Sequence, residues 1–353
     1  MLVLASGAAS RAAEESEDLP IAIRDCYAIG SSDQCALEQG AHWFFVHGYQ
    51  HLSLRKDASP SLVVRVAEED HSASVFPLGS PAIPQPVERR ARRTGARAPC
   101  HAVAANYDFS DPPCPYPEII FELAVYQVLP LGLLRIEHGR YQVQQPPLEE
   151  DEVRRLAPQI RYGVPMGGEL EHLIAAYRQG TLAPVLGPFV RKGPLVYVGL
   201  LGGFTEEEGS LGGLAVFDLS GAKWTVHRPR ELVEVFVTDM LLRDDKLWMG
   251  TVHYAEGGLI GISGLVEFDL ASGEFHSHSV NGTTPGVVWM VRGNSRATTH
   301  KEQGALLQCL WLGTDRGLGF FDPRSGDLES WVWEAAPAGS AVPYQLRHVP
   351  KTP

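Results

Sequence analysis

The chain has 353 residues, of which 44% are hydrophobic and 20% are charged. This balance excludes a disordered chain and a small scaffold held by disulfides alone. The net charge of −12 offers no basic surface, so we expect no nucleic-acid partner. The 36 glycines and 26 prolines exceed the usual share and indicate many turns, and therefore many short strands.

Residues 1–18 resemble the end of a secretory signal. A short apolar run, Met1–Ala5, is followed by small residues up to Ala13 and then by Glu14. This stretch lacks a positively charged start. We interpret it as a truncated leader, and the alternative is a disordered cytosolic N-terminus. We expect no transmembrane segment, because the longest apolar stretch, near 123–134, falls short of the roughly 20 residues that a span needs.

The cysteines favour an oxidising compartment. Cys26 lies close to Cys35, and Cys100 lies close to Cys114. Two local pairs predict two disulfides, so we expect a periplasmic or secreted protein. The alternative is a cytoplasmic protein with five buried thiols. Cys309 falls within an apolar strand and is expected to be a buried, inert thiol.

Residues 19–117 are interpreted as one or more propeller blades with disulfide-bearing irregular loops. The apolar runs 42–46, 52–55 and 62–66 read as strands of one blade. Asp70 and His71 could act as an acid–base pair, because a carboxylate raises the pKa of a neighbouring imidazole. We favour a solvated loop for them.

The segment Ser80–Pro117 is rich in proline and arginine and is predicted to be a long surface loop. It contains the basic run Arg89–Arg93. Such a run could dock an anionic lipid or polysaccharide, but we favour a plain solvated loop.

Residues 118–345 are assigned to propeller blades. The runs 121–128, 132–136 and 140–143, with a turn at 137–139, read as one blade. Residues 168–177 could form two strands or a short helix, because Leu170, Leu173, Ile174 and Tyr177 fit one helical face. Residues 346–353 are assigned to a C-terminal tail.

The clearest signal is a repeat within residues 185–335. Three apolar runs begin at Leu195, Leu247 and Leu310, and each is followed by a glycine-led run that ends in an aspartate. The aspartates Asp218, Asp269 and Asp322 are 51 and 53 residues apart. A turn with Gly221, Gly273 or Gly326 follows, where a tight hairpin needs a positive φ. A period near 50 with several short strands is typical of β-propeller blades.

At these residues the chain resembles the propeller repeat of two-component-regulator sensor regions, which reads roughly LW(apolar)GTxxGLxxFDxx(S/T)G. Leu310–Gly326 fits nearly residue for residue, Leu247–Gly273 fits with an insertion, and Leu195–Gly221 fits more loosely. The resemblance implies a propeller and brings no catalytic residues with it. We therefore predict an all-β fold, a single β-propeller with six or seven blades of four antiparallel strands.

Two neighbouring repeats carry equal insertions between their second and third strands. Gly199 to Gly213 and Gly250 to Gly264 each span 14 residues, whereas Gly313 to Gly317 spans 4. These loops share the face that rims the channel, and long surface loops often hold binding residues. The candidate ligand-binding residues are Phe204, Glu206, Glu208, Asp239, His253, Tyr254 and Glu256. The alternative is that the glutamates form solvated loop tips and the imidazole and aromatic rings pack within longer hairpins.

No motif typical of a hydrolase, a metalloprotease or a nucleotide-binding protein occurs. We therefore favour a ligand- or partner-binding and sensing module of the bacterial cell envelope, and assign no catalytic residues. Its ligand would be a protein, a small molecule or a carbohydrate held at the channel rim by a monomer. One alternative is a propeller hydrolase or lyase with a channel-bound divalent metal. A third possibility is a purely structural interaction scaffold. We expect no cofactor other than such a divalent cation.

Overall fold

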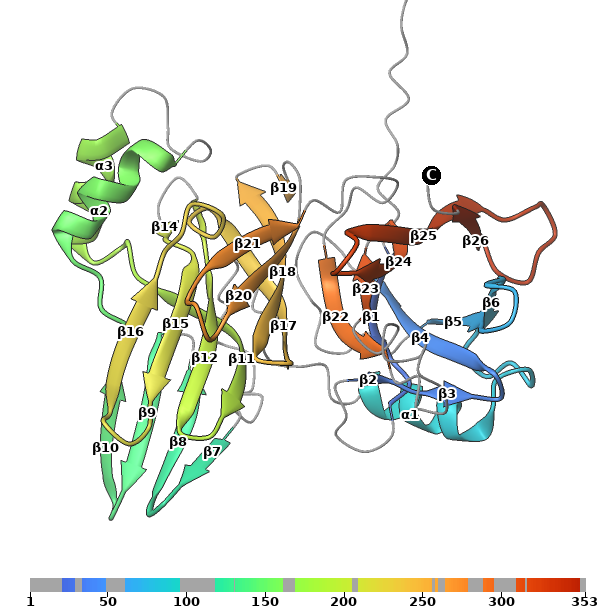
Figure 1. Ribbon diagram of the computed structural model, residues 1–353, viewed down its shortest axis with the longest axis horizontal. Helices are drawn as coiled ribbons and strands as arrows, with labels where there is room; N and C mark the ends of the chain where they lie inside the picture. The colour runs from blue at the N-terminus through green and yellow to red at the C-terminus, as the bar shows by residue number, and fades with distance from the viewer. Residues whose placement is uncertain are drawn as a thin grey trace, which may run out of the picture.

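The computed structural model describes residues 21–28, 34–48, 61–95, 118–129, 131–160, 169–204, 209–255, 258–259, 264–278, 288–294, 309–314 and 316–349. These residues are nearly all β and form one sheet each of nine, six, five and four strands, and a two-stranded hairpin (Figure 1). The nine-stranded sheet comprises two four-stranded units, called here the first and second repeat sheets, and one short added strand; the pairing of Leu201 with Phe236 joins the two units. The leader-like residues 1–18, the strand expected at 52–55 and the pair Cys100 and Cys114 lie outside the described residues. The ring of six or seven blades stays a prediction.

The N-terminal sheet has the order β1-β4-β5-β6, with β3 paired to β4. Its strands are β1 (Ile21–Cys26), β3 (Leu37–Glu38), β4 (Ala41–Gly48), β5 (Leu62–Ala67) and β6 (Ala73–Pro77). Helix α1 (Gln85–Gly95) follows. The hairpin sheet contains β7 (Glu118–Phe121), β8 (Ala124–Leu129), β9 (Gly132–Glu137) and β10 (Arg140–Gln144).

Three short helical segments follow the hairpin sheet: α2 (Glu150–Leu156), η1 (Ala157–Gln159) and α3 (Glu169–Gln179). The first repeat sheet contains β11 (Val185–Lys192), β12 (Leu195–Leu201), β15 (Gly213–Asp218) and β16 (Lys223–His227). The second repeat sheet contains β17 (Val235–Arg243), β18 (Lys246–Ala255), β20 (Leu265–Asp269) and β21 (Phe275–His278). The insertions add β13 (Gly203–Phe204), β14 (Gly209–Ser210) and β19 (Gly258–Leu259).

The C-terminal sheet contains β22 (Val288–Asn294), β23 (Leu310–Thr314), β24 (Gly317–Asp322), β25 (Asp327–Ala335) and β26 (Tyr344–Val349). The short β2 (Gln34–Cys35) pairs parallel to β22. Residues 346–349, assigned from the sequence to a tail, therefore form most of β26, which pairs with β25.

The repeated aspartates hold the turns between the third and fourth strands of each repeat. The Oδ1 atoms of Asp218, Asp269 and Asp322 accept hydrogen bonds from backbone N–H groups two residues on, at 2.8–3.0 Å. Gly273 and Gly326 have positive φ, of 75° and 77°. The expectation for Gly221 is wrong, because Ala222 takes the left-handed conformation in the first repeat, with φ 47°.

The threonine of the repeat closes the loop between the second and third strands. Thr251 Oγ1 donates to the carbonyl oxygen of Gly264 at 3.0 Å, and Thr314 Oγ1 donates to that of Gly317 at 3.1 Å. Both contacts join the threonine of the repeat to the glycine that leads the next apolar run. The insertion after Thr251 therefore leaves the base of the loop intact, which is why a longer loop is accommodated.

In each repeat, one glycine lies where the next sheet approaches its backbone closely. A Cβ on Gly199 would lie 2.6 Å from Val237 Cβ, and one on Gly250 would lie 3.0 Å from the Val288 carbonyl oxygen. A Cβ on Gly313 would lie 2.3 Å from the carbonyl oxygen of Ile23. These three glycines occupy equivalent positions in the repeat. The N-terminal sheet therefore packs against the C-terminal sheet in the same way as each later sheet packs against the repeat sheet before it.

The first long strand of each following sheet shows the same equivalence. β17 has a register shift after Val237, β22 after Val288 and β1 after Ile23. β-bulges bend a strand and increase its local twist. Each shift therefore lies immediately after the residue that the glycine of the preceding sheet contacts.

Apolar cores between successive sheets define their order in space. Tyr126 of the hairpin sheet packs in one cluster with Phe217 of the first repeat sheet. Clusters of the same kind join the first to the second repeat sheet, and the second repeat sheet to the C-terminal sheet. A further cluster joins the C-terminal sheet to the N-terminal sheet. In it Phe44 of β4 packs with Trp311 of β23, so the first and last of the described sheets lie side by side (Figure 1).

Helix α1 covers the other face of the N-terminal sheet. Trp43 and Phe45 of β4 alternate with the inward Phe44 and pack with Val87 and Ala91 of the helix. The prediction of a loop throughout 80–117 is therefore wrong for residues 85–95. The prediction fails because Val87 and Ala91, four residues apart, form an apolar stripe on the helix. Composition does not reveal this stripe, because arginines dominate the segment.

Candidate functional site

The first insertion lies against β18, the strand that leads into the second insertion. The first folds back as the hairpin β13–β14, in which Phe204 pairs with Gly209. The second extends β18 beyond the repeat, so that Tyr254 pairs with Leu259 of β19. Strand β13 contacts β18. Neighbouring sheets therefore contribute one hairpin each to a common edge of the molecule.

The structure describes some of the predicted rim residues only in part and others not at all. The backbones of Phe204, His253 and Tyr254 lie on β13 and β18, the two strands in contact. The side chains of these three residues lie outside the described part of the structure, as do Glu206, Glu208 and Glu256 entirely. Their role in ligand binding stays a prediction.

Asp239 is the predicted rim residue whose side chain is described. It lies on β17 opposite Gly250, where the second insertion begins. Its Oδ2 accepts a hydrogen bond from Val291 N at 2.8 Å and pairs with Arg292 of β22. Burial raises the pKa of the Asp239 carboxyl, and the nearby Arg292 opposes this shift. Asp239 thus ties the second repeat sheet to the C-terminal sheet.

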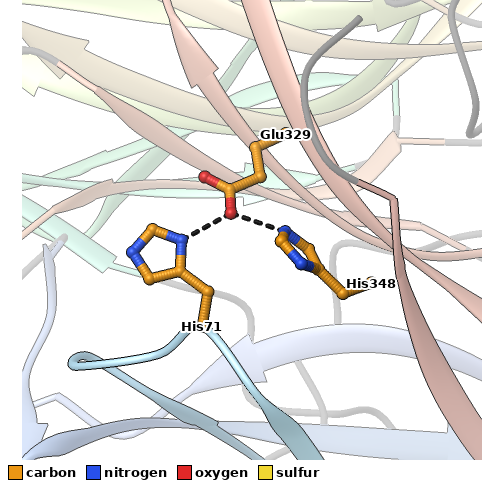
Figure 2. A group of neighbouring side chains, drawn as sticks. All are labelled: His71, Glu329 and His348. Carbon is orange, nitrogen blue, oxygen red and sulfur yellow. Dashed lines mark hydrogen bonds and ion pairs between the residues drawn. The ribbon is translucent and has the colours of Figure 1, made fainter.

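A second cluster of chemically active side chains joins the N-terminal and C-terminal sheets. His71 lies in the turn between β5 and β6, Glu329 on β25 and His348 on β26 (Figure 2). His71 Nδ1 lies 2.5 Å from Glu329 Oε1, and His348 Nε2 lies 2.7 Å from the same oxygen. Both imidazoles therefore converge on one carboxylate oxygen.

Local structure positions the two histidines. His71 has a positive φ of 56°, in a turn where Asp70 Oδ1 accepts a hydrogen bond from Ser72 N at 3.0 Å. The Ser72 backbone N–H lowers the pKa of the Asp70 carboxyl. Asp70 therefore shapes the turn and does not pair with His71, so the adjacent acid–base pair considered from the sequence does not form.

Trp331 supports both imidazoles. It is the cross-strand partner of His348, and the two rings stack with centroids 5.2 Å apart. Its indole Nε1 donates a hydrogen bond of 2.8 Å to the carbonyl oxygen of His71. A single buried tryptophan thus holds the backbone of one histidine and the ring of the other.

Burial differs within the cluster. The Glu329 side chain is 9% exposed, whereas those of His71 and His348 are 44% and 32% exposed. The carboxylate therefore lies at the base of the cluster, and the two imidazoles lie between it and solvent. In the part of the chain that the structure describes, these three residues are the one group of three or more His, Cys, Asp or Glu residues close enough to hold a metal ion.

The sequence contains little to reveal this cluster. His71 stands out beside Asp70, but Glu329 and His348 belong to no motif and are 258 and more residues away. Strand alternation on β25 and β26 could place Glu329 and His348 on faces of a sheet. It could not show that the β5–β6 turn reaches that face.

The structure bears out one of the two predicted disulfides. Cys26 and Cys35 are bonded, with Cα atoms 5.5 Å apart, and they tie β1 to β2. Cys309 is buried as predicted. No helix of the described residues is both long enough and apolar enough to cross a lipid bilayer.

Comparison with known proteins yields no family. No family model matches the chain, and no curated protein matches it. The resemblance to the two-component-regulator-type repeat therefore rests on the residues of the repeat itself.

Among solved structures, similar chains include the extracellular domain of BT4673 from B. thetaiotaomicron, at 12% identity and a TM-score of 0.32. PorZ, a surface component of the type-IX secretion system of Porphyromonas gingivalis, has 10% identity and a TM-score of 0.36. A GH74 xyloglucanase from Xanthomonas campestris has 13% identity and a TM-score of 0.28.

These matches cover 95%, 93% and 82% of this chain but 34%, 37% and 34% of the solved chains. The chain thus spans about a third of their length. At these identities and TM-scores we draw no conclusion on function from them.

Proposed function

We propose that the protein is a ligand- or partner-binding module of the bacterial cell envelope, with its binding surface on the two insertion hairpins. The observation that carries the proposal is the contact of β13, in the first insertion hairpin, with β18, the strand that leads into the second. Both hairpins exceed the length that the third repeat needs for the same connection. Surface loops beyond the minimum length are where binding residues concentrate.

The residues of the hairpins are the basis for the class of ligand that we propose. Phe204 and Tyr254 supply aromatic rings, and His253 supplies an imidazole. Glu206, Glu208 and Glu256 supply carboxylates. Aromatic rings with polar groups suit a carbohydrate or a polar small molecule, and a protein loop of complementary charge fits the same chemistry.

The disulfide supports a location outside the cytoplasm. Cys26 and Cys35 form a bond between buried side chains of the N-terminal sheet. Disulfides persist in the periplasm and outside the cell and are rare in the cytosol. We therefore place the proposed module in the periplasm or among secreted proteins.

The test uses envelope fractions of the host, with polysaccharide and protein immobilised separately. The second insertion is shortened by replacing residues 252–263 with Asp-Arg, so that Thr251 closes on Gly264 as Thr314 closes on Gly317. A milder variant is Tyr254→Ala, and its control is Tyr141→Ala, an exposed aromatic ring on the hairpin sheet.

We expect one fraction to retain the wild-type protein and the Tyr141→Ala variant. The shortened and Tyr254→Ala variants should be retained less. The thermal midpoint of Tyr254→Ala should stay close to wild type; that of the shortened variant should fall because buried Val252 is lost, while its unfolding should remain cooperative. Binding by the shortened variant that equals wild type, or no retention of the wild-type protein by any fraction, would contradict the proposal.

A further inference from the structure

The cluster of His71, Glu329 and His348 has the donor atoms of a metal site. Two ring nitrogens lie 2.5 and 2.7 Å from one carboxylate oxygen, and all three ligand atoms lie within 4.8 Å of one another. Around tetrahedral Zn²⁺, with bonds of about 2.0–2.2 Å, ligand atoms are about 3.3 Å apart. Small rotations of the two half-exposed imidazoles therefore open the space for one ion.

The type of donor selects the metal. Two imidazoles and one carboxylate suit Zn²⁺ and its transition-metal neighbours, whereas Ca²⁺ and Mg²⁺ prefer sets of oxygen ligands. We propose that His71 Nδ1, Glu329 and His348 Nε2 bind one divalent transition-metal ion, with Zn²⁺ as the expected species. Three protein ligands leave a fourth position for water or for an anionic group of a ligand.

The surroundings suit such a site. The exposure of the two histidines provides an entry path, and the buried Glu329 is already directed at both of them (Figure 2). Trp331 restrains His71 through its carbonyl oxygen and His348 by stacking. Partners of this kind orient metal ligands, and their loss commonly weakens metal binding by about 10–100-fold.

The position of the site gives it a structural consequence. His71 belongs to the N-terminal sheet, and Glu329 and His348 belong to the C-terminal sheet. A bound ion would fasten the first sheet of the chain to the last, across 258 residues of sequence. Because a ligand that binds the folded state raises its stability, the metal should raise the thermal midpoint.

The experiment titrates Zn²⁺ into the chelator-treated, tag-free protein by calorimetry, with Co²⁺ absorption as a report on coordination. The variants are Glu329→Gln and His348→Gln. The matched control is His278→Gln, because His278 pairs with the buried Glu267 at 2.8 Å without belonging to a group of three ligands. Midpoints measured in excess chelator check that each variant is folded.

We expect one Zn²⁺ per wild-type chain and a midpoint that rises with Zn²⁺. Both cluster variants should bind more than about 100-fold more weakly, since loss of a ligand should exceed the loss of an outer partner. The His278→Gln variant should bind as wild type does. If Glu329→Gln does not fold, His71→Ala, at an exposed turn, carries the same expectation.

Two results overturn the proposal. One is the absence of Zn²⁺ binding at about one ion per wild-type chain. The three residues would then be a hydrogen-bonded His–Glu–His group and not a metal site. The other is undiminished binding by the cluster variants, which would place the metal elsewhere on the chain.

Discussion

The contact between Gly313 and Ile23 predicts that Gly313→Ala destabilises the protein through the junction of its two terminal sheets. The added Cβ would lie 2.3 Å from the Ile23 carbonyl oxygen and 3.0 Å from its carbonyl carbon. Ordinary contacts begin near 3.4 Å, so β1 and β23 would have to separate by about 1 Å. The obstacle is backbone, which cannot rotate away as a side chain can.

The magnitude follows from this overlap. Overpacking of a close-packed interior typically destabilises by about 1–3 kcal/mol, and an immovable backbone neighbour favours about 3 kcal/mol. With about 2.1 cal/mol/K of unfolding entropy per residue, 353 residues give ~0.7 kcal/mol/K. The midpoint should therefore fall by about 4 °C.

The equivalent glycines provide a graded series. Gly199→Ala meets the Val237 side chain at 2.6 Å and should have a smaller effect, and Gly250→Ala, at 3.0 Å, the smallest. The control is Gly264→Ala, whose nearest neighbour is 3.7 Å away, and we expect a change within about 0.5 kcal/mol.

Differential scanning calorimetry at one fixed scan rate compares all four variants with wild type. If Gly313→Ala and Gly264→Ala had equal midpoints, β1 would not cross β23 as the structure has it. The assignment of the N-terminal sheet as the neighbour of the C-terminal sheet would then be refuted.

Three further predictions concern single contacts. Replacing Cys26 and Cys35 with alanine opens a loop with a sequence separation of 9 and should lower the unfolding free energy by about 2–3 kcal/mol. Dithiothreitol should lower the denaturation midpoint of the wild-type protein and leave that of the double variant unchanged. Glu152→Ala removes the partner, at 2.6 Å, of the buried Arg228 guanidinium and should destabilise by about 3–5 kcal/mol in urea titrations, and an unchanged midpoint would contradict a buried pair. Arg178 and a second arginine lower the pKa of the exposed Glu150 to about 2, so its contribution to stability is present above pH 4.5 and is lost as pH falls toward 2. Glu150→Gln should flatten the fall of the thermal midpoint over that range slightly, and parallel curves for variant and wild type would refute this.

The candidate site was predictable from the sequence only in part. The equal insertions after Gly199 and Gly250 predict two long loops on one face, and the structure brings β13 of the first against β18, which leads into the second. The position of Asp239 in its repeat predicts a role at the rim, and the structure pairs its carboxylate with Arg292 of the next sheet. The His71 cluster was missed, because a carboxylate on a strand and a histidine near the chain end carry no local signal of their meeting.

The sequence by itself determined the repeating units of this protein. Each unit has an apolar run, which ends in a threonine in the second and third repeats, and then an aspartate turn; the units are spaced at about 50 residues. These features specify hairpins through local contacts. Local pattern does not predict α1. Its apolar stripe is short, and the helix is stabilised by packing on the N-terminal sheet.

Only the tertiary structure decided which units are neighbours. The packing of Ile23 on Gly313, and of His71 on Glu329, joins residues 258 or more apart. Such contacts depend on how sheets with similar apolar faces stack, and many pairs of faces are chemically equivalent. The choice among them depends on the close fit of backbone to glycine, which is a property of three-dimensional packing and cannot be deduced from local pattern.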